Sequence, residues 1–334
     1  MNGTTTAQLA EKTAKAVTGS VEEWTGFLQS AARLYKYSYP EQLLIYAQRP
    51  DATACASYEI WNQTMRRYVR RGARGIALPD GAGAVRYVFD VADTGARKSS
   101  REVKTWALDE NNREAIAHAL ETQYGSAAKL GIAGQLEEIA MQQSMDYWQW
   151  HQDELRGIVD GSFLEGYDEL NLEIAFRNTA AASVKYMLLS RCNLAREYQV
   201  EPEELAGVLE WNTSAASGAL GSAVSELSEG VLRQIERTIR QYERSQNHDE
   251  RTDVYEERRV LDSRSDSSRT ADGAEQIRTD AGMVSEGASD DHLQQPAPER
   301  EADRAPDGNR PGGGESDGGN HAGAGEAGWR DGSA

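Results

Sequence analysis

The chain has 334 residues and a formal net charge of −18, and aromatic residues make up 7% of it. Its two cysteines lie far apart and form no CxxC motif, which argues against a disulfide framework and favours a reducing, cytoplasmic compartment. The N-terminal sequence MNGTTTAQLAEKTAKAV lacks the apolar run of a secretion signal, and no stretch approaches about 18 consecutive apolar residues, so no membrane segment is predicted.

Composition and hydropathy divide the chain into four predicted regions. Residues 1–20 are polar and expected to be flexible, 21–109 mix helix and strand patterns, and 110–244 have helical periodicity. From 245 to 334, acidic residues outnumber basic ones about two to one and large apolar residues are almost absent, which predicts a disordered linker or tail. We therefore predict an α+β fold: N-terminal helices with a small antiparallel β-hairpin or sheet, then a mainly helical domain, then a disordered tail.

The region 21–109 begins with helical patterns and continues with strands. Ser20 and Glu23 resemble a capping box, and Pro40 opens the short apolar helix EQLLIYAQ, which must end before the next proline. A third helix is expected over 58–65. The runs GIALPD and AVRYVFDV flank the turn sequence DGAG and predict a hairpin, to which residues 106–108 are expected to add a short third strand.

The region 110–244 is predicted to be helical. Apolar spacing indicates helices near 116–120, over 130–159 and over 171–192, and a short helix beginning at Pro202. Thr213 is placed to cap a long last helix, whose apolar residues recur every three or four positions. This stripe is interpreted as a core-packing face, with partner binding or a coiled coil as the alternative. The sequence GALG within the same helix predicts a close helix contact.

Motifs of common catalytic and metal sites are absent from the sequence. There is no GxxxxGK[ST] loop, no HExxH, no GxSxG elbow and no GxGxxG after a strand, and the five histidines are isolated. Ser190, Arg191 and Cys192 are interpreted as structural. We therefore expect no metal, no cofactor and no enzymatic activity, and a function in binding.

The stretch MRRYVRRGARGIALPD concentrates positive charge in an acidic chain. Its arginines are Arg66, Arg67, Arg70, Arg71 and Arg74. If the segment is extended, Arg66, Tyr68 and Arg70 share one side; if it is helical, Arg66, Arg70 and Arg74 line one face. Either geometry gives a dense cationic surface around Tyr68, and Gly72 and Gly75 allow the backbone to turn tightly.

These residue types favour nucleic-acid binding. Planar guanidinium groups match phosphate oxygens, and an aromatic ring can stack on an unpaired base, for which Tyr68 and Trp61 are candidates. Gln42 and Tyr46, from the apolar helix, are further candidates. Alternatively, the arginines bind another anion, or pair with the acidic tail or with the protein's own acids, of which we consider Glu22, Glu23 and Glu59.

The run YPEQLLIYAQRPDATACASYEIWNQTMRRYVRRGARGIAL resembles the N-terminal domain of ArdC-type antirestriction proteins. The family pattern has an Asn-Gln-Leu-Leu-Ile helix, Ala-Gln, a proline, Ala-Thr, a tryptophan and a Val-Arg-Lys-Gly-Glu-Lys-Gly-Ile run. The matching positions are Gln42, Leu43, Leu44, Ile45, Ala47, Gln48, Pro50, Ala52, Thr53, Trp61, Val69, Arg70, Gly72, Gly75 and Ile76. Arg71 and Arg74 replace lysines, whereas Glu41 and Ala73 depart from the pattern.

The resemblance covers residues 40–90 and implies binding of single-stranded DNA, which is how the family domain is described. ArdC proteins also carry a zinc-dependent protease-like domain with HExxH, and that activity is not carried over to a chain without the motif.

The segments IVDGSFLEGYDELN and SRCNLAREYQVEPEEL look like the part that follows this domain in very large proteins of integrative conjugative elements. Those proteins continue into helicase or DNA-methylase modules. We therefore expect a DNA-binding module of a mobile conjugative element, forming the N-terminal part of a larger protein with such modules as partners. The alternative is a protein-interaction or antirestriction module that acts on host nucleases through charge.

Overall fold

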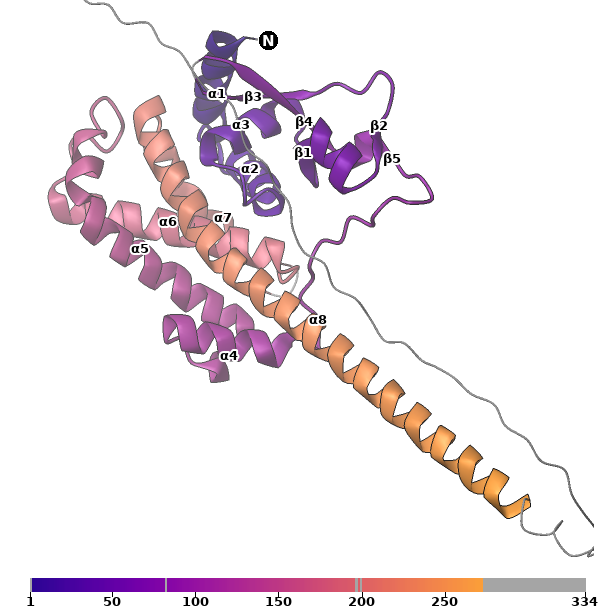
Figure 1. Cartoon of the computed structure of the whole chain (residues 1–334). Helices are drawn as coiled ribbons and strands as arrows, with labels where there is room; N and C mark the ends of the chain where they lie inside the picture. Colours follow the sequence, from indigo (N-terminus) through magenta and orange to yellow (C-terminus); the bar gives the residue numbers. More distant parts are fainter. Residues whose placement is uncertain (1, 82, 196–197, 199, 273–334) are drawn as a thin grey trace, which may run out of the picture. The chain divides into compact units, whose positions relative to one another are not determined.

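The computed structural model describes residues 2–272 except 82, 196, 197 and 199, and describes side chains as far as residue 246 (Figure 1). The helices are α1 (Gly3–Val17), α2 (Val21–Arg33), α3 (Tyr39–Gln48), α4 (Arg113–Tyr124), α5 (Gly131–Gly157), α6 (Glu169–Arg191), α7 (Pro202–Leu205) and α8 (Ser214–Asp272). The strands are β1 (Cys55–Ser57), β2 (Tyr68–Val69), β3 (Ile76–Pro79), β4 (Val85–Asp90) and β5 (Thr94–Gly95). Short helical turns are η1 (Ile60–Thr64), η2 (Val91–Asp93), η3 (Ala128–Leu130) and η4 (Ala206–Glu210).

Helix α1 occupies most of residues 1–20, which the sequence predicted to be flexible. Asn2 caps the helix by accepting a hydrogen bond from a first-turn amide at 2.9 Å. Ala14 and Val17 are buried in the main core, and α1 packs against α3 and β3. Thr13 is buried as well, because its hydroxyl bonds to a backbone carbonyl one turn earlier. The prediction of flexibility is wrong. Threonine hydroxyls that bond to carbonyls of their own helix can be buried, so a polar sequence can still form the buried face of an amphipathic helix.

The two helices that follow begin where the sequence predicted. The Ser20 side chain accepts a hydrogen bond from the Glu23 amide at 3.1 Å at the start of α2. A capping box of Ser38 and Glu41 starts α3, with Pro40 in its first turn. The helix then ends before the next proline, as expected.

Strands β3 and β4 form the predicted antiparallel hairpin, with Ile76 opposite Val88. The third strand of this sheet is β1, which pairs with the other edge of β4, so the strand predicted at residues 106–108 is wrong. Trp106 is instead buried, and its indole nitrogen donates to the Tyr35 hydroxyl at 3.0 Å. The apolar pattern there marks a core contact.

The described residues contain two apolar cores, and the larger one crosses residue 109, where the sequence suggested a boundary. Trp24 of α2 belongs to this core and donates its indole hydrogen to Ser183 of α6 at 2.9 Å. Residues 1–269 accordingly form one compact unit. The smaller core lies between α3 and the sheet; its buried residues are Leu34, Leu44, Ile45, Ala52, Ile76, Leu78 and Val88.

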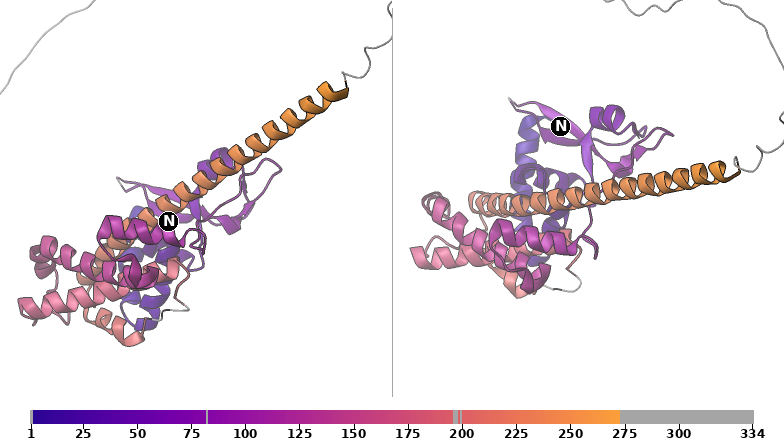
Figure 2. Two further views of the ribbon diagram at one scale, coloured as in Figure 1. Left: turned by 90° about the horizontal axis from the view of Figure 1, so that it is seen from below. Right: turned by 60° about the horizontal axis from the view of Figure 1, so that its bottom comes forward.

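The N-terminal helices lie between the strands and the pair α5–α6. Helix α3 contacts β3 on one side and α2 contacts α6 on the other, while α5 packs along α6 (Figure 1, Figure 2). No helix in the part of the chain that the structure describes combines the length and apolarity needed to cross a bilayer. The predicted class is confirmed: N-terminal helices and small antiparallel sheets precede a mainly helical region.

Helix α8 begins at the predicted cap, where the Thr213 hydroxyl accepts a hydrogen bond from the Ala216 amide at 3.2 Å. The core-packing interpretation of its stripe is confirmed for the buried residues Leu220, Val224, Val231, Ile235 and Ile239. The helix continues to Asp272, past the boundary predicted at 244. The rest of the predicted disordered tail, 273–334, lies outside the described residues.

Candidate functional site

The arginine segment is extended where it forms β2, which pairs antiparallel with β5 (Figure 1). Its side chains alternate: Arg66, Tyr68 and Arg70 are exposed, whereas Arg67 and Val69 are half-buried. The extended geometry considered from the sequence is therefore correct for this stretch, and the helical one is not.

Arg71 and Arg74 follow β2 in a turn and are exposed. Gly72 occupies this turn with φ of 85°, a left-handed conformation that favours glycine. A side-chain carbon on Gly75 would lie 3.0 Å from Tyr87 and 3.2 Å from Phe89, a tight fit that favours glycine there. Local structure therefore explains the presence of glycine at both positions.

None of the five arginines forms an ion pair with a carboxylate of the described residues. The alternative pairing with Glu22, Glu23 and Glu59 is not found. The other alternative, pairing with the acidic tail, falls outside the described side chains. Within the described part of the chain, no carboxylate is paired with the positive charge of the segment.

The acids beside the segment are engaged elsewhere. Asp93, whose carbonyl accepts the Arg70 amide at 2.8 Å, forms its ion pair with Arg49. Asp90 is buried and accepts backbone amides of Thr53 at 2.7 Å and of Ala54 at 3.0 Å. These bonds occupy the carboxylates of Asp90 and Asp93.

Two of the arginines are oriented by neutral groups. The Arg67 Nε donates to the Thr94 hydroxyl at 2.8 Å, and an Arg70 Nη donates to the Ala92 carbonyl at 3.1 Å. Hydrogen bonds of this kind fix a guanidinium group and leave its charge and its other N–H donors for a ligand.

Tyr68 presents its ring among these cations and is 41% exposed. The ring lies against Gly95, where a side-chain carbon would come within 2.3 Å of the Tyr68 ring. The guanidinium carbon of Arg97 lies 5.5 Å from the centre of the same ring, within the usual range of a cation–π contact of about 6 Å. An aromatic face is therefore held in place beside unpaired charges.

A second basic segment, which our sequence interpretation missed, follows β5. Arg97, Lys98 and Arg101 are exposed and make no ion pair within the described residues. The Ser100 hydroxyl donates to the Arg66 carbonyl at 2.7 Å and ties this segment to the first. The run ARKSSR is a basic pattern that the sequence shows. Its position beside β2 depends on the β2–β5 pairing, in which each strand has only two residues.

The two segments together form what we call the basic surface. Its members are Arg66, Arg67, Tyr68, Arg70, Arg71, Arg74, Arg97, Lys98 and Arg101.

The backbone at the start of the basic surface is strained. Arg66 has φ of 53°, in the left-handed region that residues other than glycine rarely adopt. The amide of Arg67 bonds to the carbonyl of Trp61 at 2.8 Å, and Ser100 holds the Arg66 carbonyl. Strain of this kind persists only where neighbouring bonds enforce it, and it often accompanies a binding site.

Trp61 is not part of the basic surface. It is 2% exposed, and its indole nitrogen donates to the Phe89 carbonyl at 2.8 Å. Its assignment as a stacking residue is wrong, because η1 turns this side chain toward β4.

The assignment of Gln42 to the DNA-binding residues is also wrong. It is 1% exposed, and its side-chain nitrogen donates to the carbonyls of Tyr37 at 2.8 Å and of Leu34 at 3.5 Å. These carbonyls follow α2, so the Gln42 amide supplies hydrogen bonds to backbone carbonyls of the connection between α2 and α3. A residue in this position cannot reach a ligand at the surface.

Tyr46 packs on α2 as well. Its ring makes an edge contact with Phe27 at 5.8 Å between ring centres, and a side-chain carbon on Gly26 would lie 2.9 Å from its hydroxyl. Burial raises the pKa of Tyr46. The structure therefore separates Gln42 and Tyr46 from the arginines that the sequence grouped with them.

The thiols have no features of a nucleophile. Burial raises the pKa of Cys55 and of Cys192 to about 12, so both are protonated at neutral pH. Among the described residues, no group of three or more histidine, cysteine, aspartate and glutamate side chains could hold a metal ion.

Comparison of the chain with protein-family models, with curated proteins and with solved structures gives no match that reaches significance. The interpretation of the basic surface therefore depends on its own geometry and on the sequence pattern around it.

Proposed function

We propose that the basic surface binds single-stranded DNA, and that the protein is a DNA-binding module without catalytic activity. The observation that carries the proposal is a set of arginine and lysine side chains that have no carboxylate partner among the described residues and surround an exposed tyrosine. Guanidinium groups bind phosphate oxygens through their planar forks, and bases stack on aromatic rings.

A single strand suits this surface better than a duplex. An unpaired base can reach the half-exposed ring of Tyr68, whereas a base within a duplex is already stacked. The resemblance of residues 40–90 to the ArdC N-terminal domain supports the same ligand. Two segments tied together by Ser100 would contact the backbone on either side of the stacked base.

The test is a salt titration with labelled single-stranded DNA and with a duplex of the same sequence. We expect Arg70→Ala/Arg71→Ala to weaken single-strand binding and to lower the slope of log affinity against log salt by about 1.4, since each lost phosphate contact contributes about 0.7. Fluorescence anisotropy measures both quantities. Binding that is absent, or that is unaffected by the double substitution, would show that the proposal is wrong.

Two further sets of variants test the other contributions to affinity. One measures base stacking on Tyr68, and the other measures the effect of total charge. Tyr68→Ala is expected to lose about 1–3 kcal/mol of binding free energy with little change in salt slope, whereas Tyr68→Phe keeps most of the affinity. Arg233→Ala/Arg237→Ala removes two exposed arginines of α8 and serves as the control for total charge. The control should leave the affinity close to that of the unchanged protein.

A further inference from the structure

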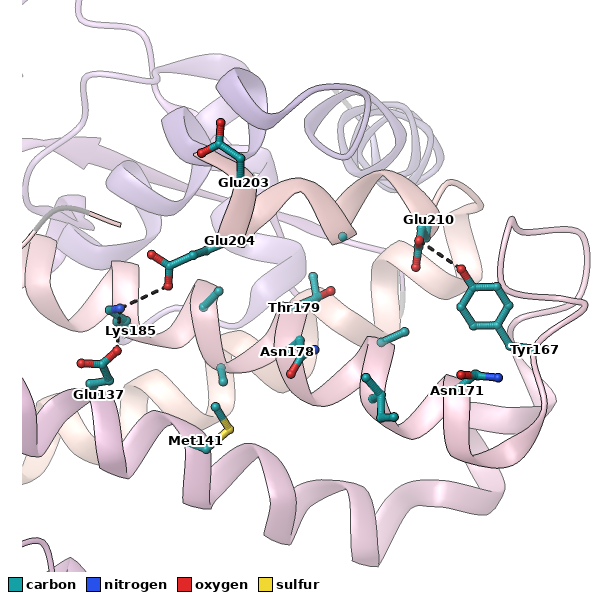
Figure 3. Close-up of a pocket in the computed structure, with 15 residues that line it drawn as sticks. Glu137, Met141, Tyr167, Asn171, Asn178, Thr179, Lys185, Glu203, Glu204 and Glu210 are labelled. Atoms are coloured by element: carbon teal, nitrogen blue, oxygen red, sulfur yellow. Dashed lines mark hydrogen bonds and ion pairs between the residues drawn. The ribbon is translucent and has the colours of Figure 1, made fainter. Parts of the chain in front are cut away.

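A groove crosses the helical region, well separated in sequence from the basic surface. Helix α6 forms its floor, and α5 and the α7–η4 segment form its two walls (Figure 3). Its volume is about 550 Å³. The α6 residues that line it follow the spacing of one helix face: Asn171, Ile174, Ala175, Asn178, Thr179, Ala181, Ala182 and Lys185.

The walls of the groove are acidic. Glu137 comes from α5, and Glu203, Glu204 and Glu210 come from the opposite wall. Lys185 is the lining cation, and it is already bonded to Glu137 at 2.7 Å and to Glu204 at 3.2 Å. Glu210 accepts the Tyr167 hydroxyl at 3.1 Å and pairs with no cation among the described residues, so the groove retains negative charge. The Glu203 side chain points away from the floor (Figure 3).

Apolar side chains are exposed inside these acidic walls. Met141, Tyr167 and Ile174 are 43%, 41% and 45% exposed. Apolar surface enclosed by charged residues is typical of a protein-interaction site. The small residues Ala175 and Ala182 on the floor leave room for another backbone to approach α6 closely.

We propose that this groove binds a basic amphipathic α-helix of a partner protein. The charge of the walls selects lysine and arginine on the flanks of the partner helix, and the exposed apolar residues select an apolar face between them. The lining face of α6 runs from Asn171 to Lys185, about 21 Å at 1.5 Å a residue, which matches a helix of about 14 residues. The same acids would repel phosphate, so this site is distinct from the DNA-binding surface.

A designed peptide tests the proposal on the full chain. The probe is a labelled peptide of about 14 residues with alanine and leucine on one helical face and lysine on the other. We expect it to bind the unchanged protein, and we expect Asn178→Arg to weaken binding about tenfold or more by adding bulk and like charge on the floor. Fluorescence anisotropy measures binding, and circular dichroism confirms that the exposed substitution leaves the fold intact.

The controls assign each outcome to one interpretation. Gln149→Arg adds the same charge at an exposed position of α5 outside the groove and should leave peptide affinity unchanged. A peptide with glutamate in place of lysine should not bind, and Asn178→Arg should leave single-stranded-DNA binding unchanged. Equal binding by Asn178→Arg and the unchanged protein overturns the proposal. Self-association that Asn178→Arg abolishes overturns it too, because the groove would then bind a second copy of the chain.

Discussion

Gly218 and Gly221 lie three residues apart in α8 but have different surroundings. A side-chain carbon on Gly221 would lie 2.1 Å from the ring of Tyr39, whereas Gly218 has open space around the same position. Tyr39 is itself buried and packs edge-on against Phe27, with ring centres 5.7 Å apart. The ring of Tyr39 can therefore not move aside without disturbing the main core, and the close helix contact predicted from GALG is confirmed at Gly221.

This difference gives a matched pair of substitutions. Gly221→Ala is expected to lower the free energy of unfolding by about 1–3 kcal/mol, because the added methyl group overpacks the contact with Tyr39. Gly218→Ala is expected to raise it by about 0.5–1 kcal/mol, because alanine is the better helix former. Urea denaturation followed by circular dichroism measures both. Similar effects of the two substitutions would contradict the close contact.

Single residues also show how far sequence reasoning extends at the basic surface. The alternation of exposed and half-buried side chains over 66–70 was predictable, because a strand allows only two faces. The burial of Trp61 and Gln42 was not, since an aromatic ring or an amide suits a surface and a core equally well. Only the fold shows that backbone carbonyls already occupy their donors.

At the scale of elements, one buried carboxylate joins α8 to the chain that follows α2. Glu236 of α8 accepts the Tyr35 hydroxyl at 2.5 Å and the Lys36 ammonium at 2.7 Å, and it pairs with Arg240 one turn along its own helix. Burial alone would raise the pKa of Glu236, but the hydrogen bonds from Lys36 and Tyr35 and the nearby charges outweigh it, so the pKa is lowered. Trp106 extends the network by donating to Tyr35.

Glu236→Gln is expected to lower the free energy of unfolding by about 1–3 kcal/mol at neutral pH, because it removes a charged acceptor from this network. A carboxyl group whose pKa is lower in the folded state stabilises the fold fully above its unfolded pKa. That contribution is lost as the pH falls through the folded value. The difference between the two proteins should therefore hold down to the ordinary carboxyl value of 4.5 and shrink below it.

Denaturation at a series of pH values checks this, with Glu229→Gln as the control on the same helix. Glu229 forms an ion pair with Arg233 one turn away at the surface, and its loss should cost about 0.5 kcal/mol or less. A Glu236→Gln effect that is no larger than the control, or that grows in acid, would contradict the role assigned to the network.

The accuracy of the predicted elements follows the strength of their local signals. The β3–β4 hairpin and the capped helices were predictable, because turn residues, caps and periodic apolar residues are local features. Strands β1 and β5 were not predicted, since two or three residues carry no pattern and their pairing depends on distant partners. The second half of the basic surface was missed for the same reason.

At the scale of the whole molecule, the boundaries were the least predictable feature. The composition changes near residue 109, yet Trp24 and Ser183 bond across that point within one core. Sequence periodicity indicates which face of a helix is apolar but not which other helix covers it. A boundary is therefore visible in sequence where the composition changes, whether or not the packing changes there.

The distribution of charge over the whole chain leads to a last prediction. Residues 273–334 contain 13 aspartates and glutamates and 5 arginines, whereas the arginines of the basic surface have no acidic partner among the described residues. A tethered acidic segment competes with DNA phosphates for the same cations, so a chain ending at Asp272 should bind single-stranded DNA more tightly at low salt. The gain in affinity should fade as salt screens the charges over a Debye length of about 8–10 Å.

Anisotropy titrations of the two chains at low and high salt measure this gain in affinity, and Arg70→Ala/Arg71→Ala in both chains should reduce it. Equal affinities at low salt would mean that the acidic residues do not act on the basic surface, and would leave them to a separate role such as contact with another protein.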